Sequence, residues 1–71
     1  MRLLGIMLQQ AGLSFMTAQA THHPLGMSLN EIVCKTGEEA QRVNEWAIRE
    51  GFAVVARVAT PEEREEHERL A

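Results

Sequence analysis

Residues 36–63 read TGEEAQRVNEWAIREGFAVVARVATPEE, and this stretch contains two helix-start signatures that set the order of the elements around them. Thr36 and Thr60 are each followed three residues later by a glutamate. In such a capping box the threonine hydroxyl accepts from the backbone N–H three residues on, and the glutamate reaches back to the threonine N–H. Pro61 suits the first turn of a helix, because a first-turn residue needs no N–H. The stretch therefore predicts two helices, one after Thr36 and one after Thr60.

The segment from Gly37 to Glu50 has the pattern of an amphipathic helix. Its apolar residues recur at spacings of three and four, while charged and amide side chains gather on the opposite side. The apolar stripe consists of Ala40, Val43, Trp46 and Ala47, widened by Ile48. Gly51 can take the left-handed conformation that ends a helix.

The apolar run Phe52–Ala59 follows at once and is typical of a strand. Because both of its faces are largely apolar, we expect a central strand. Upstream, Asn30–Lys35 has a β-branched centre and predicts a further strand leading into the Thr36 cap. Strand, helix and strand then form a unit whose two strands lie parallel through a right-handed crossover.

The first 28 residues are less clearly patterned. Leu13–Thr21 alternates loosely and is followed by the turn-like His22–Gly26, which favours a hairpin. Arg2–Gln10 is compatible with another strand or with a short buried helix, because periodicity does not separate the two in so short a run. The expected fold is α+β: a small, mostly antiparallel sheet packed on one amphipathic helix, with a polar C-terminal helix.

A chain of 71 residues predicts one small domain, with residues 1–60 as its core and residues 61–71 as an acidic helix. This length is near the lower limit for a single hydrophobic core without disulfides or metal, so we expect a homodimer. The one cysteine, Cys34, has no partner for an intrachain disulfide, which favours a reducing cytoplasm. The simplest role for Cys34 is that of a small buried hydrophobe.

The formal net charge of −3 comes from the C-terminal segment alone. Residues 1–60 carry five acidic and five basic side chains, whereas residues 61–71 carry five glutamates and two arginines. An acidic segment repels phosphate backbones and attracts basic proteins. We therefore expect a partner with a basic surface, and we assign its contacts to Glu62, Glu65, Glu66 and Arg69. Trp46 is either a core residue or an apolar anchor for that partner.

No catalytic or metal-binding pattern is present in the sequence. His22 and His23 are adjacent rather than spaced as paired zinc ligands, and Cys34 and His67 stand alone. The chain has no nucleophile elbow, no glycine-rich phosphate loop and no paired-carboxylate motif. We expect no enzyme activity, no cofactor and no metal. No stretch approaches the roughly 20 apolar residues that span a membrane.

A DNA-binding alternative rests on Val33, Gly37 and Val43, whose spacing resembles that of a helix-turn-helix. It would make Ser28–Lys35 a helix, place Glu39–Glu50 in the DNA groove, and turn the strand Ala53–Val58 into the wing of a winged-helix regulator. The residues contacting DNA would be Arg42, Arg49 and Arg57. The acidic side chains beside them and the absence of a basic patch count against this alternative.

The function predicted from the sequence is therefore that of a non-enzymatic protein-interaction module, an adaptor or a small inhibitor. Small acidic proteins of phages and other mobile elements inhibit host factors through steric and electrostatic complementarity, and the size and charge of this chain offer that analogy. Nucleic acid is a partner only under the winged-helix alternative.

Overall fold

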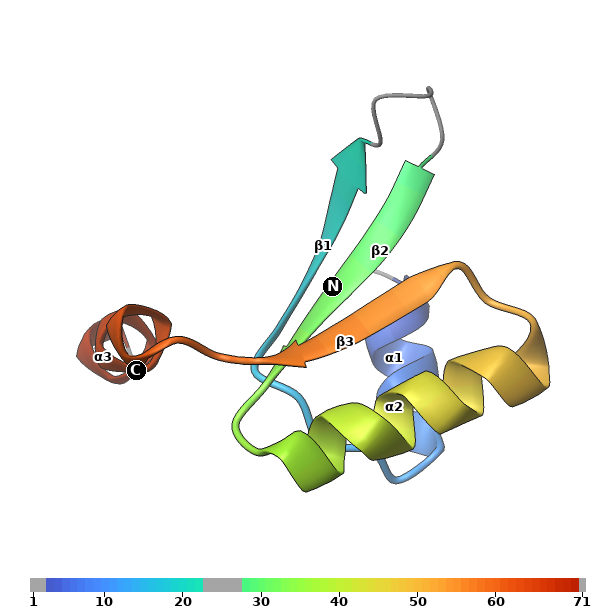
Figure 1. Ribbon diagram of the computed structural model, residues 1–71, viewed down its shortest axis with the longest axis horizontal. Helices are drawn as coiled ribbons and strands as arrows, with labels where there is room; N and C mark the ends of the chain where they lie inside the picture. The colour runs from blue at the N-terminus through green and yellow to red at the C-terminus, as the bar shows by residue number, and fades with distance from the viewer. Residues whose placement is uncertain (1–2, 23–27, 71) are drawn as a thin grey trace.

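The computed structural model describes residues 3–22 and 28–70. The elements follow in the order α1 (Leu3–Gln10), β1 (Thr17–His22), β2 (Ser28–Cys34), α2 (Gly37–Glu50), β3 (Val54–Val58) and α3 (Pro61–Leu70). Helices α1 and α2 lie on one side of the sheet, and α3 lies beyond the end of β3 on the other (Figure 1). Residues 3–10, for which the sequence left strand and helix open, form a helix.

The strands form one mixed sheet in the order β1-β2-β3. Strands β1 and β2 pair antiparallel, with Gln19 opposite Glu31, which confirms the expected hairpin pairing. Of the predicted turn His22–Gly26, His22 is instead the last residue of β1, and residues 23–26 lie outside the described part of the chain. Strands β2 and β3 pair parallel, with Ile32 opposite Ala56, as the strand, helix and strand unit predicts. The fold is therefore α+β, with a small sheet packed on helices.

Both predicted helix caps are present. At α3 the box is complete, because the Glu63 N–H donates to the Thr60 hydroxyl at 3.2 Å and the Thr60 N–H donates to the Glu63 carboxylate at 2.9 Å. At α2 the Glu39 N–H donates to the Thr36 hydroxyl at 3.1 Å, but the Glu39 carboxylate accepts from that hydroxyl rather than from the backbone. Gly51 ends α2 in the left-handed conformation, with φ 77°.

The hydrophobic core lies between α2, the facing side of β2 and β3, and α1. Its buried members are Leu8, Ile32, Cys34, Ala40, Val43, Trp46, Ala47 and Ala56. The stripe predicted for α2 is thus buried except for Ile48, which is 82% exposed. Ile48 lies just past the edge of the buried stripe, where α2 has no neighbour in the described chain that would cover it.

The expectation that Phe52–Ala59 is a central strand is wrong. The central strand is β2, and β3 is at the edge of the sheet. The sequence suggested otherwise because both faces of the run are largely apolar. One face does pack into the core through Ala56, but Val55 on the other face is 47% exposed.

Candidate functional site

The face of the sheet opposite α2 carries a chain of polar side chains that leads to α3. Gln19 of β1 donates to the Glu31 carboxylate of β2 at 2.8 Å. The Arg57 guanidinium of β3 donates to Glu31 at 3.3 Å and to both carboxylate oxygens of Glu63 at 2.6 and 2.8 Å. Gln19, Glu31 and Arg57 alternate with the core positions of their strands, so they share one face of the sheet, and Glu63 reaches that face from α3. They connect all three strands to α3.

This arrangement changes the pKa values of the groups within it. The two hydrogen bonds from Arg57 lower the pKa of Glu63 to about 2, with a further contribution from the Thr60 N–H. The hydrogen bonds from Gln19 and then Arg57 lower the pKa of Glu31. The two carboxylates raise the pKa of Arg57. Hydrogen bonds to the charged form stabilise that form, so all three groups are ionised at neutral pH.

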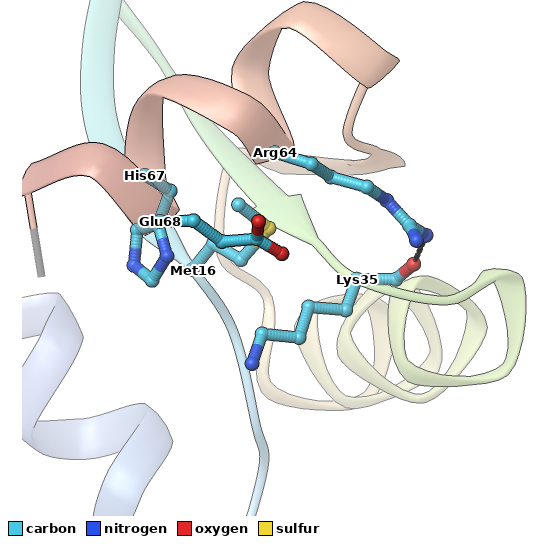
Figure 2. A pocket seen from close by; sticks show the side chains of 5 residues that line it. All are labelled: Met16, Lys35, Arg64, His67 and Glu68. Atoms are coloured by element: carbon cyan, nitrogen blue, oxygen red, sulfur yellow. Dashed lines mark hydrogen bonds between the residues drawn. The ribbon is translucent and has the colours of Figure 1, made fainter.

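A second contact holds α3 against the end of the sheet. The Arg64 side chain extends from α3 and donates to the backbone carbonyl of Lys35, between β2 and α2 (Figure 2). Met16, Lys35, Arg64, His67 and Glu68 enclose a small pocket of about 110 Å³. The Lys35 side chain extends away from Arg64, so its ammonium group does not share the contact. Together, Arg57 and Arg64 anchor the first turns of α3.

A wider groove of about 270 Å³ separates α3 from β1 and β2. One wall is sheet and the other is helix; the lining residues are Met16, Thr17, Gln19, Val33, Glu63, Glu66, His67 and Leu70. Val33 is only 2% exposed, whereas Leu70 at the end of α3 is 79% exposed. The groove thus combines apolar side chains with carboxylates on its helical wall, which suits a segment that carries both apolar and basic residues.

The acidic residues predicted to contact a partner lie on α3, which has no buried residue at all. Glu62, Glu65, Glu66 and Arg69 are exposed, and Glu66 also lines the groove. Arg69 lies 3.7 Å from Glu65, with both side chains largely in solvent. By contrast, Trp46 belongs to the core: it is 6% exposed and stacks on Phe52, with the ring centroids 5.1 Å apart.

The helix required by the DNA-binding alternative is absent. Ser28–Cys34 is the central strand, and the predicted wing is a parallel neighbour of that strand rather than part of a hairpin. The β-branched residues at positions 32 and 33 favour the extended conformation that the sheet uses. The helix-turn-helix prediction is therefore wrong.

The arginines named for that alternative do not form a common basic surface. Arg57 is bound by Glu63 and Glu31, and Arg42 forms an ion pair with Glu38 at 2.5 Å. Arg49 is exposed in the last turn of α2. Two of the three guanidinium groups thus already have carboxylate partners.

Cys34 is buried and free, and it donates to the Ser14 carbonyl at 3.8 Å. Burial, followed by the negative charge of Glu39, raises the pKa of its thiol, which disfavours the thiolate. In the described ranges, 3–22 and 28–70, no three histidine, cysteine or acidic residues are grouped so that they could hold a metal ion. Within the same ranges, no helix has the length and apolar character needed to cross a membrane.

The chain matches no protein-family model, no curated protein and no solved structure closely enough to establish a relationship. Its function is therefore inferred from its own residues and geometry.

Sequence reasoning found the acidic helix but missed what fixes it in place. The sequence indicates Glu63 as a capping residue and as one of the acidic residues of the C-terminal helix, and it suggests Arg57 as a DNA contact of the winged-helix alternative. Their pairing depends on the chain path between β3 and α3, which no residue spacing specifies. The one available signal was that a lone arginine in an apolar strand needs a partner for its charge.

Proposed function

We propose that this chain is a non-enzymatic protein-interaction module that binds a basic partner surface through α3. The observation that carries the proposal is that α3 buries none of its side chains yet is anchored at its start by Arg57 and Arg64. A helix that contributes nothing to the core but is held in one position is suited to contact something else. Four of its eight exposed residues are glutamates, namely Glu62, Glu65, Glu66 and Glu68.

The electrostatics support the same proposal. Of the glutamates of α3, Glu63 is neutralised by Arg57, which leaves Glu62, Glu65, Glu66 and Glu68 to set the charge of the exposed surface. Arg69 provides partial compensation beside Glu65. Such a ridge attracts lysine and arginine side chains, and the attraction weakens as salt screens it, with a Debye length of about 10 Å at 0.1 M.

The groove beside α3 adds an apolar component to this charged ridge. Leu70 and Met16 line it together with Glu66. A basic partner that also carries an apolar side chain would gain hydrophobic contact there in addition to the salt-dependent attraction. We propose that the module acts as an adaptor or inhibitor by covering a basic surface of its partner.

The experiment compares two variants with the same change in net charge. One replaces Glu62, Glu65 and Glu66 of α3 with glutamine, and the other replaces Glu38, Glu45 and Glu50 of α2. Binding of a fluorescein-labelled oligolysine peptide is followed by fluorescence anisotropy at low salt. Exposed ion pairs contribute up to about 1 kcal/mol each, so the α3 variant should bind roughly tenfold more weakly than wild type, with the α2 variant close to wild type. Equal losses in the two variants would refute the role of α3.

A further inference from the structure

The two edges of the sheet are not equivalent, and the edge formed by β3 is already occupied. The Asn30 N–H donates to the Ala53 carbonyl at 3.1 Å, and the Ala59 N–H donates to the Cys34 carbonyl at 2.8 Å. Backbone groups alternate in direction along a strand, so the amides of Val54, Ala56 and Val58 point away from β2. These three residues form the outer edge of β3.

Each residue on the outer edge of β3 has a local hydrogen-bond partner. The Val54 N–H donates to the Phe52 carbonyl at 3.0 Å. Asn44 of α2 accepts from the Ala56 N–H at 2.8 Å and donates to the Ala56 carbonyl at 3.1 Å, so one side chain binds both groups as a neighbouring strand would. The Val58 carbonyl accepts from Arg57 at 3.4 Å. A further strand could not add to β3 without displacing Asn44.

The outer edge of β1 is open among the residues that the structure describes. The backbone N–H of Asn30 and the carbonyl of Cys34 in β2 are hydrogen-bonded to β3. Since the backbone groups of successive residues point in opposite directions, those of Glu31, which follows Asn30, point to β1 and to its register partner Gln19. The amides of Ala18 and Ala20 therefore point outward. No described side chain is hydrogen-bonded to them in the way that Asn44 is bonded to Ala56. The sequence of β1, TAQATH, contains no proline, lysine or acidic residue of the kind that protects natural sheet edges.

We infer that a second copy of this chain pairs with the outer edge of β1, so that two three-stranded sheets join into one. An antiparallel pairing about a two-fold axis at Gln19 places Ala18 of one copy opposite Ala20 of the other. The Ala18 N–H of each copy then donates to the Ala20 carbonyl of the other copy, and the Ala20 N–H donates to the Ala18 carbonyl. The same contacts occur twice, as a two-fold symmetric interface requires. Since β1 carries no Asp, Glu, Lys or Arg, and its one histidine, His22, lies opposite residue 16 of the other copy in this register, no like charges meet across the strand pair.

The position of α3 favours the antiparallel arrangement. The groove beside α3 is lined by Met16 and Thr17, so the acidic helix lies near the start of β1. Antiparallel pairing in this register puts Thr17 of one copy opposite Thr21 of the other, so the two strand starts are four residues, or about 14 Å, apart along the strand pair. This separation exceeds the Debye length of about 10 Å at 0.1 M salt, so the two acidic helices do not oppose dimerisation. A parallel pairing would bring them side by side.

A small domain also gains from such an interface. The chain is 8.0 kDa, a size at which a single core buries a smaller share of the chain surface than the core of a larger domain does. Joining the two sheets gives hydrogen-bond partners to the backbone groups on the outer edge of β1. Left unpaired, such an edge can bind strands of other chains and lead to aggregation. The interface is independent of the partner proposed for α3, and it leaves the acidic ridge of both copies accessible.

The test measures molar mass and amide exchange on the full chain. Sedimentation equilibrium from roughly micromolar to millimolar concentration should show the mass rising towards twice 8.0 kDa. Ala20→Pro removes one outward N–H and should remain at the monomer mass, since proline is tolerated at an edge position that faces solvent. The control Ala20→Val keeps the N–H and should dimerise like wild type. Circular dichroism reports whether each variant is folded.

The outcomes separate cleanly. Either of two results would overturn the inference: a wild-type chain that stays monomeric at every concentration, or a folded Ala20→Pro variant that still dimerises. Because the inference concerns a second copy of this chain, binding of a strand from another protein to the same edge would not rescue it. If Ala20→Pro does not fold, hydrogen exchange of wild type decides the matter. Slower exchange of the Ala18 and Ala20 amides at high concentration supports the β1 interface. Exchange that is independent of concentration at both amides overturns it.

Discussion

The Arg57 guanidinium donates to both carboxylate oxygens of Glu63, at 2.6 and 2.8 Å, and this pair connects the last strand to the last helix. Arg57 also reaches Glu31 of the central strand, so α3 is fixed to the sheet rather than trailing from it. Charge-assisted pairs with two parallel bonds set geometry as well as energy. The position of the acidic ridge on α3 follows from this pair.

The Arg57–Glu63 pair predicts a specific pH dependence. The pKa of Glu63 is lowered from 4.5 to about 2 in the folded chain, so its stabilising contribution is complete above pH 4.5 and is lost as the pH falls towards 2. The lowered pKa of Glu31 acts in the same direction. Thermal unfolding midpoints of wild type should therefore fall more steeply across this range than those of Glu63→Gln. Glu68→Gln serves as an exposed control, and a Glu63→Gln profile parallel to that of wild type would contradict the assignment.

Asn44 is expected to stabilise the domain although it is only partly buried. Asn44→Ala removes both hydrogen bonds to Ala56 and should lower the free energy of unfolding by about 1–2 kcal/mol in urea denaturation. The control Gln41→Ala loses one exposed hydrogen bond to Glu45 and should change the free energy by less than about 0.5 kcal/mol. Similar losses for the two variants would mean that Asn44 does not protect the edge of β3.

Trp46 is expected to act through the core rather than at a partner surface. Trp46→Ala should cost about 3–5 kcal/mol, a large part of the stability of a small domain, and leave the chain largely unfolded by circular dichroism. Trp46→Phe keeps a ring beside Phe52 and should remain folded with reduced stability. A stable, folded Trp46→Ala chain that had lost only oligolysine binding would reverse the assignment.

The sequence predicts the helices and the strand pairing around them well, because those depend on local chemistry. Thr36, Gly51 and Thr60 mark helix ends through backbone groups within a few residues, and all three act as expected. The extended conformation of residues 30–34 likewise follows from β-branched side chains. These features need no knowledge of the tertiary fold.

The features that the sequence did not predict, the edge position of β3 and the pairing of Arg57 with Glu63, depend on how the elements are arranged in the tertiary fold. The apolar faces of residues 52–59 suggest a central strand, but Asn44 takes the place of the missing neighbour, and nothing in the spacing of residues 44 and 56 indicates that contact. The partnership of Arg57 with Glu63 depends in the same way on how α3 turns back over the sheet. The acidic composition of α3 was evident from the sequence, whereas its anchoring was not.

The measurement that tests the proposed function most directly is an NMR titration of the isotope-labelled chain with an oligolysine peptide at low salt. We predict that amide shifts change along α3, at Glu62, Glu65 and Glu66, and around the groove at Met16 and Thr17, and that these changes diminish as salt is added. Shift changes spread evenly over α2 and α3, or centred on Glu38 and Glu45, would contradict the proposal that α3 is the binding surface.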